Sequence, residues 1–461
     1  MGTFGAILRP RGPVLWIGLG LLLAGLAAAW LLARSAGTVR VGDVVIRPQA
    51  PVDPKRAYRL VLWEENVVLS GAGTTYRAFL DDRIKAFREI YPNVTIDLQL
   101  LPPGEAVNRL EAALAAGQPP DVYGSLTPRL FDPDYQVPVE RFLPRTRGDE
   151  PVFRPAAWAA LSAEGHVWGW PRWIRFTTWA GRRSLLAGTG LDVDRATREG
   201  WTFEEALESL SAVGGGRVPG LLVHPGEPEL FRSLMLAGGH GLMLQEGSLA
   251  WSPEAMGAAA AFLAAARRQA HMPSSLETAA RERVARLLQG RAGIITPVRP
   301  ELAAHLLRTI PGEELVLLPP PRPAGSALHV PAEVAAYLVF RQSPYKGDDQ
   351  TRLAMELARF LIHSKDAWVS AQFPAVPALV SDQTIWEGEA PWPAATSQAL
   401  LRWAEVAVTP SLDPDEAAVI FQMEDQVLAP RLATLWDHSD PEAWARELHQ
   451  ALTDQVPEPG G

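Results

Sequence analysis

Groups that can form hydrogen bonds follow two short segments of the chain at the points where strands are expected to end. Glu64, Glu65 and Asn66 come directly after the apolar run LVLW, and Gly124 and Ser125 follow the sequence PPDVY. Ligands of open α/β sheets bind outside the carboxyl ends of the strands. Carboxylate, amide and backbone N–H groups at such positions can orient a small molecule. A solvated strand end is the alternative interpretation of the Glu64–Glu65 pair.

Motifs for catalysis are missing from the sequence. It contains no Gly-x-Ser-x-Gly, no His-Glu-x-x-His, and no pair among its nine histidines at i, i+4 spacing. The three glycines at 214–216 precede no Lys-Ser/Thr, so they predict a loop rather than a phosphate cradle. The sequence therefore predicts no enzyme, no metal and no cofactor. An exported hydrolase remains the alternative, because paired glycosidase carboxylates converge only in the folded chain.

Composition restricts the class of protein further. At 461 residues the chain is long enough for two domains. Its net charge of −9 argues against a nucleic-acid partner, which normally requires a basic patch. The absence of cysteine excludes disulfides, thiolate catalysis, zinc–thiolate sites and a lipidated cysteine anchor.

The N-terminal part contains an uncharged apolar block at 14–33, with Arg9 and Arg11 before it. A bilayer requires about 20 such residues, whereas a signal-peptide core has about 7–15. We therefore expect a transmembrane anchor, with 1–13 in the cytoplasm, 34–57 as a linker and the rest outside the cytoplasm. Small residues near the end of the block also fit a cleavage site, so a cleaved signal segment remains the alternative.

Strand and helix patterns alternate from residue 58 to about residue 125. Apolar or alternating runs at 59–63, 94–98 and 121–123 indicate strands. Apolar residues at helical spacing over 80–91 and 107–114 indicate the helices between them. Such alternation predicts a parallel sheet covered by helices. Further along, Thr202 and Glu205 have capping-box spacing, which predicts a helix that begins there.

Several segments match, in order, the pattern of one protein family. They are LVLWEE with EIYPNVTIDLQ, LEAALAAGQPPDVYGS, GHVWGWPRW with GWTFEEALESL, LLQGRAGIITPVRPE, and LARFLIHSKDAWVSAQFPAVPAL. They resemble the extracellular solute-binding proteins of ABC importers, family 1 or maltose type, over roughly 58–380. The chain departs from this pattern at Trp179–Arg182, which lacks the usual asparagine, and at Val298–Arg299, where many members have tryptophan.

The resemblance implies a type II periplasmic-binding-protein-like fold, in which two α/β lobes close on a ligand in the cleft between them. The expected lobes are 58–172 with 320–365, and 173–319 with 366–456. It also implies ligand contacts where strands end or lobes cross, and aromatic contacts in the C-terminal region. Beyond the five strand-end residues above, the expected ligand-binding residues are Trp173, Arg175, Phe231, Arg299, Trp392 and Trp403.

Packing roles compete with some of these expectations. Trp168 and Trp170 favour packing between lobes, Arg175 could pair with an acid across the hinge, and Trp403 lies in a helical run that suits a core. The function implied by the resemblance is capture of a carbohydrate-like molecule for the permease subunits of an ABC importer. An anchored receptor for a separate signalling partner would share this fold and cleft.

Overall fold

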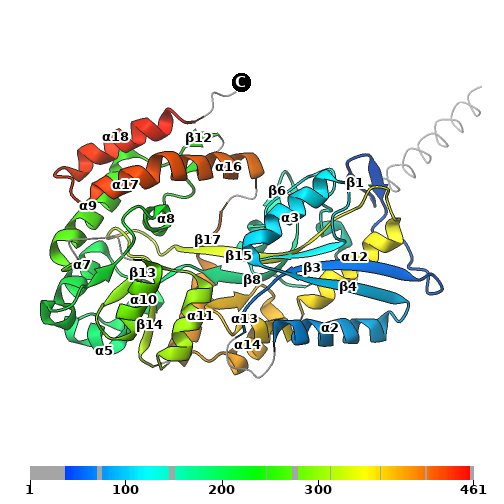
Figure 1. Cartoon of the computed structure of the whole chain (residues 1–461), viewed down its shortest axis with the longest axis horizontal. Helices are drawn as coiled ribbons and strands as arrows, with labels where there is room; N and C mark the ends of the chain where they lie inside the picture. The colour runs from blue at the N-terminus through cyan, green and yellow to red at the C-terminus, as the bar shows by residue number, and fades with distance from the viewer. Residues whose placement is uncertain are drawn as a thin grey trace, which may run out of the picture.

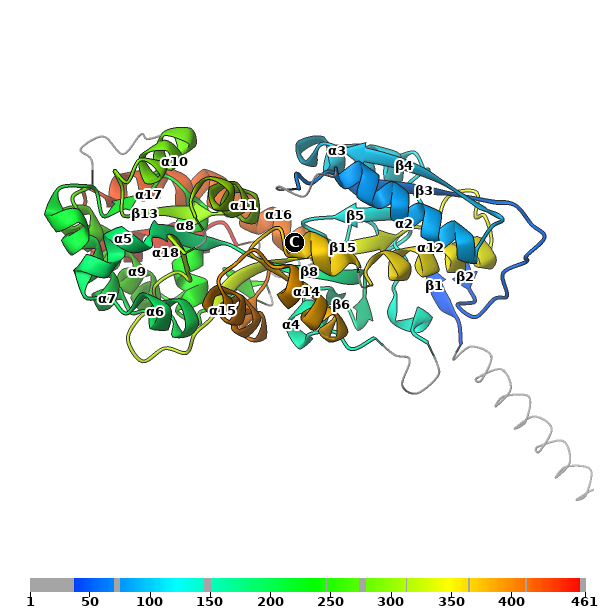
Figure 2. The same ribbon diagram turned by 90° about the horizontal axis from the view of Figure 1, so that it is seen from below.

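A computed structural model of the chain shows two α/β lobes, each built around its own sheet (Figure 1, Figure 2). The predicted anchor at 14–33 and the segment before it lie outside the described residues. Among the helices of the described part, none is long and apolar enough to cross a membrane. The described residues are 37–69, 75–144, 151–245, 247–272, 279–311, 313–363, 365–410 and 413–456.

The sheet of the first lobe has the strand order β16-β8-β15-β5-β3-β4, and β17 pairs with β15. β3 is parallel to β4 and to β5, as the alternation predicts. The sheet as a whole is mixed, because β15 returns from the second lobe and lies antiparallel to β5 and β8. Its strands are β3 (Tyr58–Glu65), β4 (Val94–Leu101), β5 (Val122–Ser125), β8 (Trp170–Phe176), β15 (Val330–Val339), β16 (Ala375–Pro377) and β17 (Ala407–Val408).

Helices cover both faces of this sheet. α2 and α12 lie side by side on one face, with α3 on the other (Figure 1, Figure 2). α2 begins where the Thr75 side chain accepts a hydrogen bond from the Ala78 N–H, and it buries Leu80 and Phe87. The helices are α2 (Tyr76–Ile90), α3 (Pro103–Ala115), α4 (Pro155–Ala159), α12 (Asp348–Leu361), α13 (Lys365–Ser370), α14 (Gln383–Glu389) and α15 (Ala394–Glu405), and β6 (Ser162–Ala163) pairs with β7 (His166–Val167).

The second lobe contains the sheet β10-β13-β9-β14. Successive side chains of a strand point to opposite faces of the sheet, and here the two faces belong to different hydrophobic clusters. Ile294 lies in the cluster of the second lobe, and Ile295 lies in the cluster that continues into the first lobe. The strands are β9 (Thr178–Arg182), β10 (Leu221–Leu222), β13 (Ile294–Val298) and β14 (Leu315–Leu318), beside a small hairpin of β11 (Leu244–Gln245) and β12 (Ser248–Leu249).

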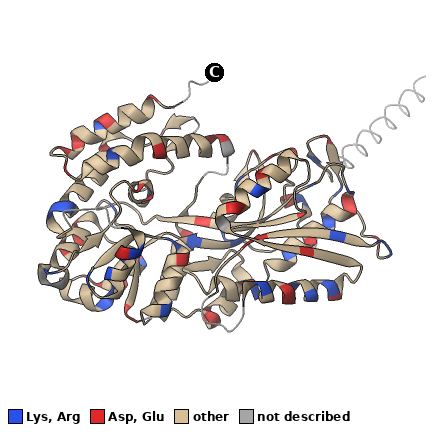
Figure 3. Cartoon of the chain, viewed as in Figure 1, with Lys and Arg blue, Asp and Glu red and all other residues tan. Residues whose placement is uncertain are grey.

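Two groups of helices enclose this second sheet. The predicted capping box is confirmed at the start of α7. The Thr202 side chain accepts a hydrogen bond from the backbone N–H of Glu205, and the Glu205 side chain accepts one from the backbone N–H of Thr202. The helices are α5 (Arg183–Leu186), α6 (Val193–Glu199), α7 (Phe203–Ala212), α8 (Pro228–Ala237), α9 (Pro253–Gln269), α10 (Ala280–Leu288), α11 (Pro300–Thr309), α16 (Pro414–Met423), α17 (Ala429–Leu435) and α18 (Pro441–Thr453). Side chains of both charges are interspersed over both lobes (Figure 3).

Within the described residues, the chain passes between the lobes at three places. β8 continues into β9 at Thr177, β14 leads to β15, and β17 leads to α16. The expected boundary at 172/173 therefore falls inside β8. The stretch 366–405, expected in the second lobe, lies with the first sheet, because β16 pairs with β8 and the following helices share its hydrophobic cluster.

The described part of the expected linker packs against the first lobe. β1 (Val39–Val41) and β2 (Val44–Ile46) form an antiparallel hairpin that buries Val41 and Ile46. Ion pairs of 2.7 and 2.8 Å then join Arg47 to Asp348 and Arg56 to Asp349 at the start of α12. Residues 37–57 are thus part of the folded lobe, because their apolar side chains find cover on it.

Candidate functional site

A cavity of about 220 Å³ lies where the crossing segments meet the second lobe. Thr177, Pro331 and Val408 line it from the crossing segments, and the other walls come from α8 and α16. Part of its wall is apolar, through Leu236, Met243, Ile420 and Phe421, and part is charged, through Glu229, Arg232, Glu333 and Glu424. Such a mixture is typical of small-molecule sites.

Glu229 connects three elements at this cavity. It lies in the first turn of α8, where Pro228 begins the helix and a carboxylate suits the helix dipole. Its Oε2 accepts hydrogen bonds from Arg299 Nε and Nη2 at 2.9 and 2.7 Å, and its Oε1 accepts one from Thr177 Oγ1 at 3.1 Å. The carboxylate of Glu229 raises the pKa of the Arg299 guanidinium. Sequence-predicted Arg299 thus lies next to the cavity, paired with Glu229.

Helix α16 contributes an exposed aromatic ring. Asp413 caps the helix by accepting from the backbone of Asp415 and Glu416. Phe421 lines the cavity although 71% of the residue is exposed. Directly after the helix, Glu424 receives two bonds from Arg232 Nη1 at 2.7 and 2.6 Å. Burial raises the pKa of Glu424, and the charge of Arg232 opposes this shift.

Arg175 joins the two lobes beside the cavity. From β8 its Nη1 donates to the Leu126 carbonyl, after β5, at 3.0 Å. Its Nη2 pairs with Glu301 in the first turn of α11, on the second lobe. Glu333 Oε2 lies 3.8 Å from Arg175 Nη1. The predicted site residue Arg175 therefore holds an acid across the hinge, which was the competing interpretation.

The predicted strand-end residue Glu64 belongs to a buried network in the first lobe. It accepts from Arg172 Nη1 at 2.5 Å and from the Tyr76 hydroxyl. Arg172 also pairs with Asp366 at 2.9 Å. The Arg172 guanidinium lies 3.9 Å from the centre of the Trp173 ring and 4.4 Å from that of Tyr337. Burial raises the pKa of Glu64, while the charge of Arg172 lowers it.

The other strand-end residues divide by exposure. Glu65 is buried and accepts from Tyr123 Oη at 2.5 Å and from Ser125 Oγ at 3.2 Å. Burial raises the pKa of Glu65, and these hydrogen bonds oppose the shift. Asn66 is exposed, and Gly124 lies against the Glu64 carboxylate. None of the predicted strand-end residues lines the cavity described above, and their contact with a ligand stays a prediction.

The predicted aromatic residues lie in the hydrophobic cores. Phe231 is fully buried, with ring centres 6.0 Å from Trp251 and 5.8 Å from Trp444. Trp403 is fully buried and donates to the Thr197 carbonyl at 3.0 Å. Trp392 is also buried, and Trp173 packs against Arg172 and Phe373. Their ligand contacts also stay predictions.

Sequence reasoning missed the residues that line the cavity. Glu229 is only two positions before the predicted residue Phe231. Phe421 lies in the C-terminal region, where the resemblance implies aromatic contacts, but the sequence does not show which apolar residue of a helix stays uncovered. In the described part of the chain, no group of three or more His, Asp or Glu side chains could hold a metal ion.

Solved structures of other proteins have a similar fold. No family model and no curated protein matches the sequence. The sugar-binding protein MalE of Xanthomonas citri matches in structure with a TM-score of 0.68 at 17% identity, over 86% of this chain and 97% of that one. The GacH receptor of Streptomyces glaucescens matches with 0.64 at 14%, over 88% and 100%. The maltotriose-binding protein of Thermus thermophilus matches with 0.62 at 12%, over 86% and 100%. The chain therefore has the two-lobed α/β fold of these binding proteins.

Proposed function

We propose that the protein captures a carbohydrate-like small molecule between its lobes and delivers it to an ABC importer, without catalysis of its own. The observation that carries this proposal is the cavity at the lobe crossings, with an exposed phenyl ring beside paired carboxylates and guanidinium groups. A sugar ring offers a C–H face to an aromatic ring and hydroxyl groups to charged partners.

The similar structures support this class of ligand. The Thermus protein is described as bound with maltotriose, and the GacH receptor as a complex with acarbose. Maltotriose and acarbose are ligands of those two proteins, which share 12% and 14% sequence identity with this chain.

The position of the cavity supports capture by closure of the lobes. It is lined by residues of the crossing segments and of the second lobe, so movement at Thr177 and Pro331 would change its shape. A ligand stabilises the closed form only to the extent that it makes more contacts there than in the open form. Delivery to a permease and tethering through 14–33 are further parts of the proposal, which rest on the sequence.

A thermal-shift screen of the full-length chain in detergent tests the proposal. The panel contains monosaccharides, maltooligosaccharides and polyols, with chromogenic glycosides and esters assayed for turnover. A true ligand at 100 times its Kd should stabilise the fold by about 2.7 kcal/mol. If no sugar shifts the melting temperature while a glycoside or ester is turned over, the protein is an enzyme and the proposal fails.

A further inference from the structure

The charges around the cavity do not balance, and we infer that the ligand carries a protonated amine, which Glu333 binds. The expected ligand class is a sugar ring with an amino group. This inference rests on the proposed function and specifies the ligand of the same site.

The arginines at the cavity are already paired. Each guanidinium contacts the carboxylate of a different glutamate: Arg232 with Glu424, Arg299 with Glu229, and Arg175 with Glu301. Arg232 Nη1 donates to both carboxylate oxygens of Glu424, and Arg299 donates from Nε and Nη2 to Glu229 Oε2, all within 2.9 Å. These pairs leave no cation that is dedicated to Glu333.

Glu333 is the carboxylate left over. It lies on β15, lines the cavity and has 38% of its side chain exposed. The nearest cation is Arg175 Nη1 at 3.8 Å, which exceeds hydrogen-bond distance. Among the described residues, no side chain or backbone group donates a hydrogen bond to the Glu333 carboxylate. The site therefore holds four glutamates and three arginines, counting the three pairs and Glu333.

Burial makes the ionised form of Glu333 less favourable than it is in water. The pKa of Glu333 is raised mainly by burial, and to a smaller extent by the carboxylates of Glu229 and Glu301. Arg175 and Arg299 oppose them. A ligand cation beside Glu333 would remove this electrostatic cost, whereas a neutral hydroxyl would leave the extra charge in place.

A protonated amine fits this carboxylate in geometry as well as charge. It is a compact cation with up to three N–H donors and can reach an acceptor from several directions. The remaining wall, with Ile420 and the exposed ring of Phe421, offers an apolar surface to the carbon skeleton of a ring. At about 220 Å³ the cavity lies below the roughly 300–1,000 Å³ of most ligand sites, which indicates one ring.

Matched sugars test this inference. Glucosamine, N-acetylglucosamine and glucose differ only in the substituent at one ring carbon, and the galactose series repeats the comparison. Calorimetric titration of the full-length chain in detergent at pH 7 should show about tenfold or more tighter binding of at least one amino sugar than of its neutral counterparts.

The Glu333→Gln variant assigns the effect to this carboxylate. It should abolish the preference, so that the amino sugar binds no more tightly than its neutral counterparts. Glu208→Gln, on the exposed face of α7, is the matched control and should keep the preference. Thermal melts of both variants check that the fold is retained.

The outcomes separate this inference from the proposed function. Neutral sugars that bind without any preference for the amine overturn the inference and leave the proposed function standing. An amine preference that survives in Glu333→Gln also overturns it, because another group must then bind the cation. If neither amino nor neutral sugars bind at millimolar concentration, the proposed function fails together with the inference.

Discussion

Gly124 and Glu64 occupy one small space at the carboxyl end of the first sheet. A Cβ atom at position 124 would overlap the Glu64 carboxylate. That carboxylate cannot move aside easily, because Arg172 and Tyr76 hold it and the surrounding side chains are buried. Glycine at 124 is therefore required by the neighbouring side chain, whatever further role the strand end has.

Gly124→Ala should destabilise the fold by about 1–3 kcal/mol through overpacking, measured by urea unfolding of the full-length chain. Gly104→Ala is the matched control, because a Cβ there meets no atom within 4 Å in helix α3. That variant should be neutral or slightly stabilising, since alanine favours helix. Equal unfolding midpoints for Gly124→Ala and wild type would contradict the steric argument.

Phe421 has the exposure expected of a ligand contact rather than of a core residue. Phe421→Ala should leave the melting temperature nearly unchanged and weaken sugar binding about tenfold, through loss of stacking and apolar cover. Calorimetric titration with a sugar identified in the screen measures this. Ile90→Ala, an exposed apolar change on α2, should leave affinity unchanged. Equal affinities of Phe421→Ala and wild type would remove Phe421 from the site.

Glu333 should make stability depend on pH in the ligand-free protein. Folding raises the pKa of Glu333 above its value in the unfolded chain, which is about 4.3. The free energy of unfolding therefore decreases as the pH rises from about 4.3 through the folded pKa. Glu333→Gln removes this loss. The variant should melt at a slightly higher temperature than wild type at pH 8, and the gap should close below about pH 4. A lower melting temperature for the variant at pH 8 would contradict this sign.

At the scale of elements, the β1–β2 hairpin extends the first lobe toward the N-terminus. Surface ion pairs such as Arg47–Asp348 contribute little on their own, so burial of Val41 and Ile46 is the main stabilising contact. A two-stranded hairpin is at best marginally stable by itself, so its burial in the hydrophobic cluster of the first lobe stabilises it.

Ile46→Ala should therefore cost about 2–5 kcal/mol in urea unfolding, as for a core position. Val45→Ala is the matched control, because Val45 is the neighbouring residue on the exposed face of β2. It should change stability by less than about 0.5 kcal/mol. Similar small effects for both would mean that the hairpin is only loosely attached in solution.

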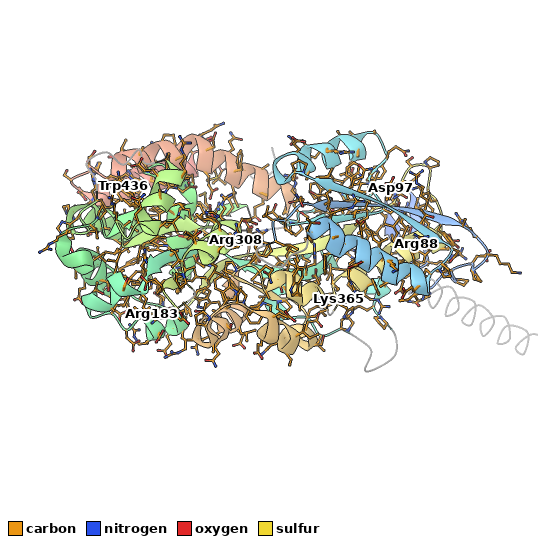
Figure 4. All side chains as sticks on the ribbon, turned by 60° about the horizontal axis from the view of Figure 1, so that its bottom comes forward. Arg88, Asp97, Arg183, Arg308, Lys365 and Trp436 are labelled. Carbon is orange, nitrogen blue, oxygen red and sulfur yellow. The ribbon has the colours of Figure 1, made fainter. Side chains whose placement is uncertain are left out.

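At the scale of the whole molecule, the lobes extend away from the crossing segments on either side. Figure 4 shows Arg88 and Asp97 on the first lobe and Arg183 and Trp436 on the second, with Arg308 between these groups. Besides the crossing segments, the Arg175–Glu301 pair connects the lobes directly. Contacts of this kind help to set the balance between open and closed forms.

Glu301→Gln should weaken sugar binding by up to about fivefold, because it removes a charge pair that joins the two lobes beside the cavity. Glu111→Gln is the control, since Glu111 is as exposed as Glu301 and its partner Arg129 lies in the same lobe. Its affinity should equal that of wild type, and both variants should melt like wild type. Tighter binding by Glu301→Gln would mean that the pair favours the open form.

The sequence by itself determined the local secondary structure, which depends on residues that are close together in the chain. The strand–helix alternation of 59–125 and the Thr202–Glu205 capping box are both present in the structure. The two-lobed fold was implied by the resemblance and is supported by the similar structures. These features follow from periodicity and hydrogen bonds over a few positions, which a sequence displays directly.

Only the tertiary structure decided which side chains stay uncovered at the cavity. Trp403 is fully buried, and its N–H reaches the carbonyl of Thr197, 206 positions away, whereas Phe421 is largely exposed. Glu229 and Arg299 form an ion pair although 70 positions separate them in the sequence. Glu333 receives no hydrogen bond from Arg175, because the nearest guanidinium pairs with Glu301 instead. A sequence shows which groups are present, but burial and pairing depend on contacts between distant segments, which exist only after the chain has folded.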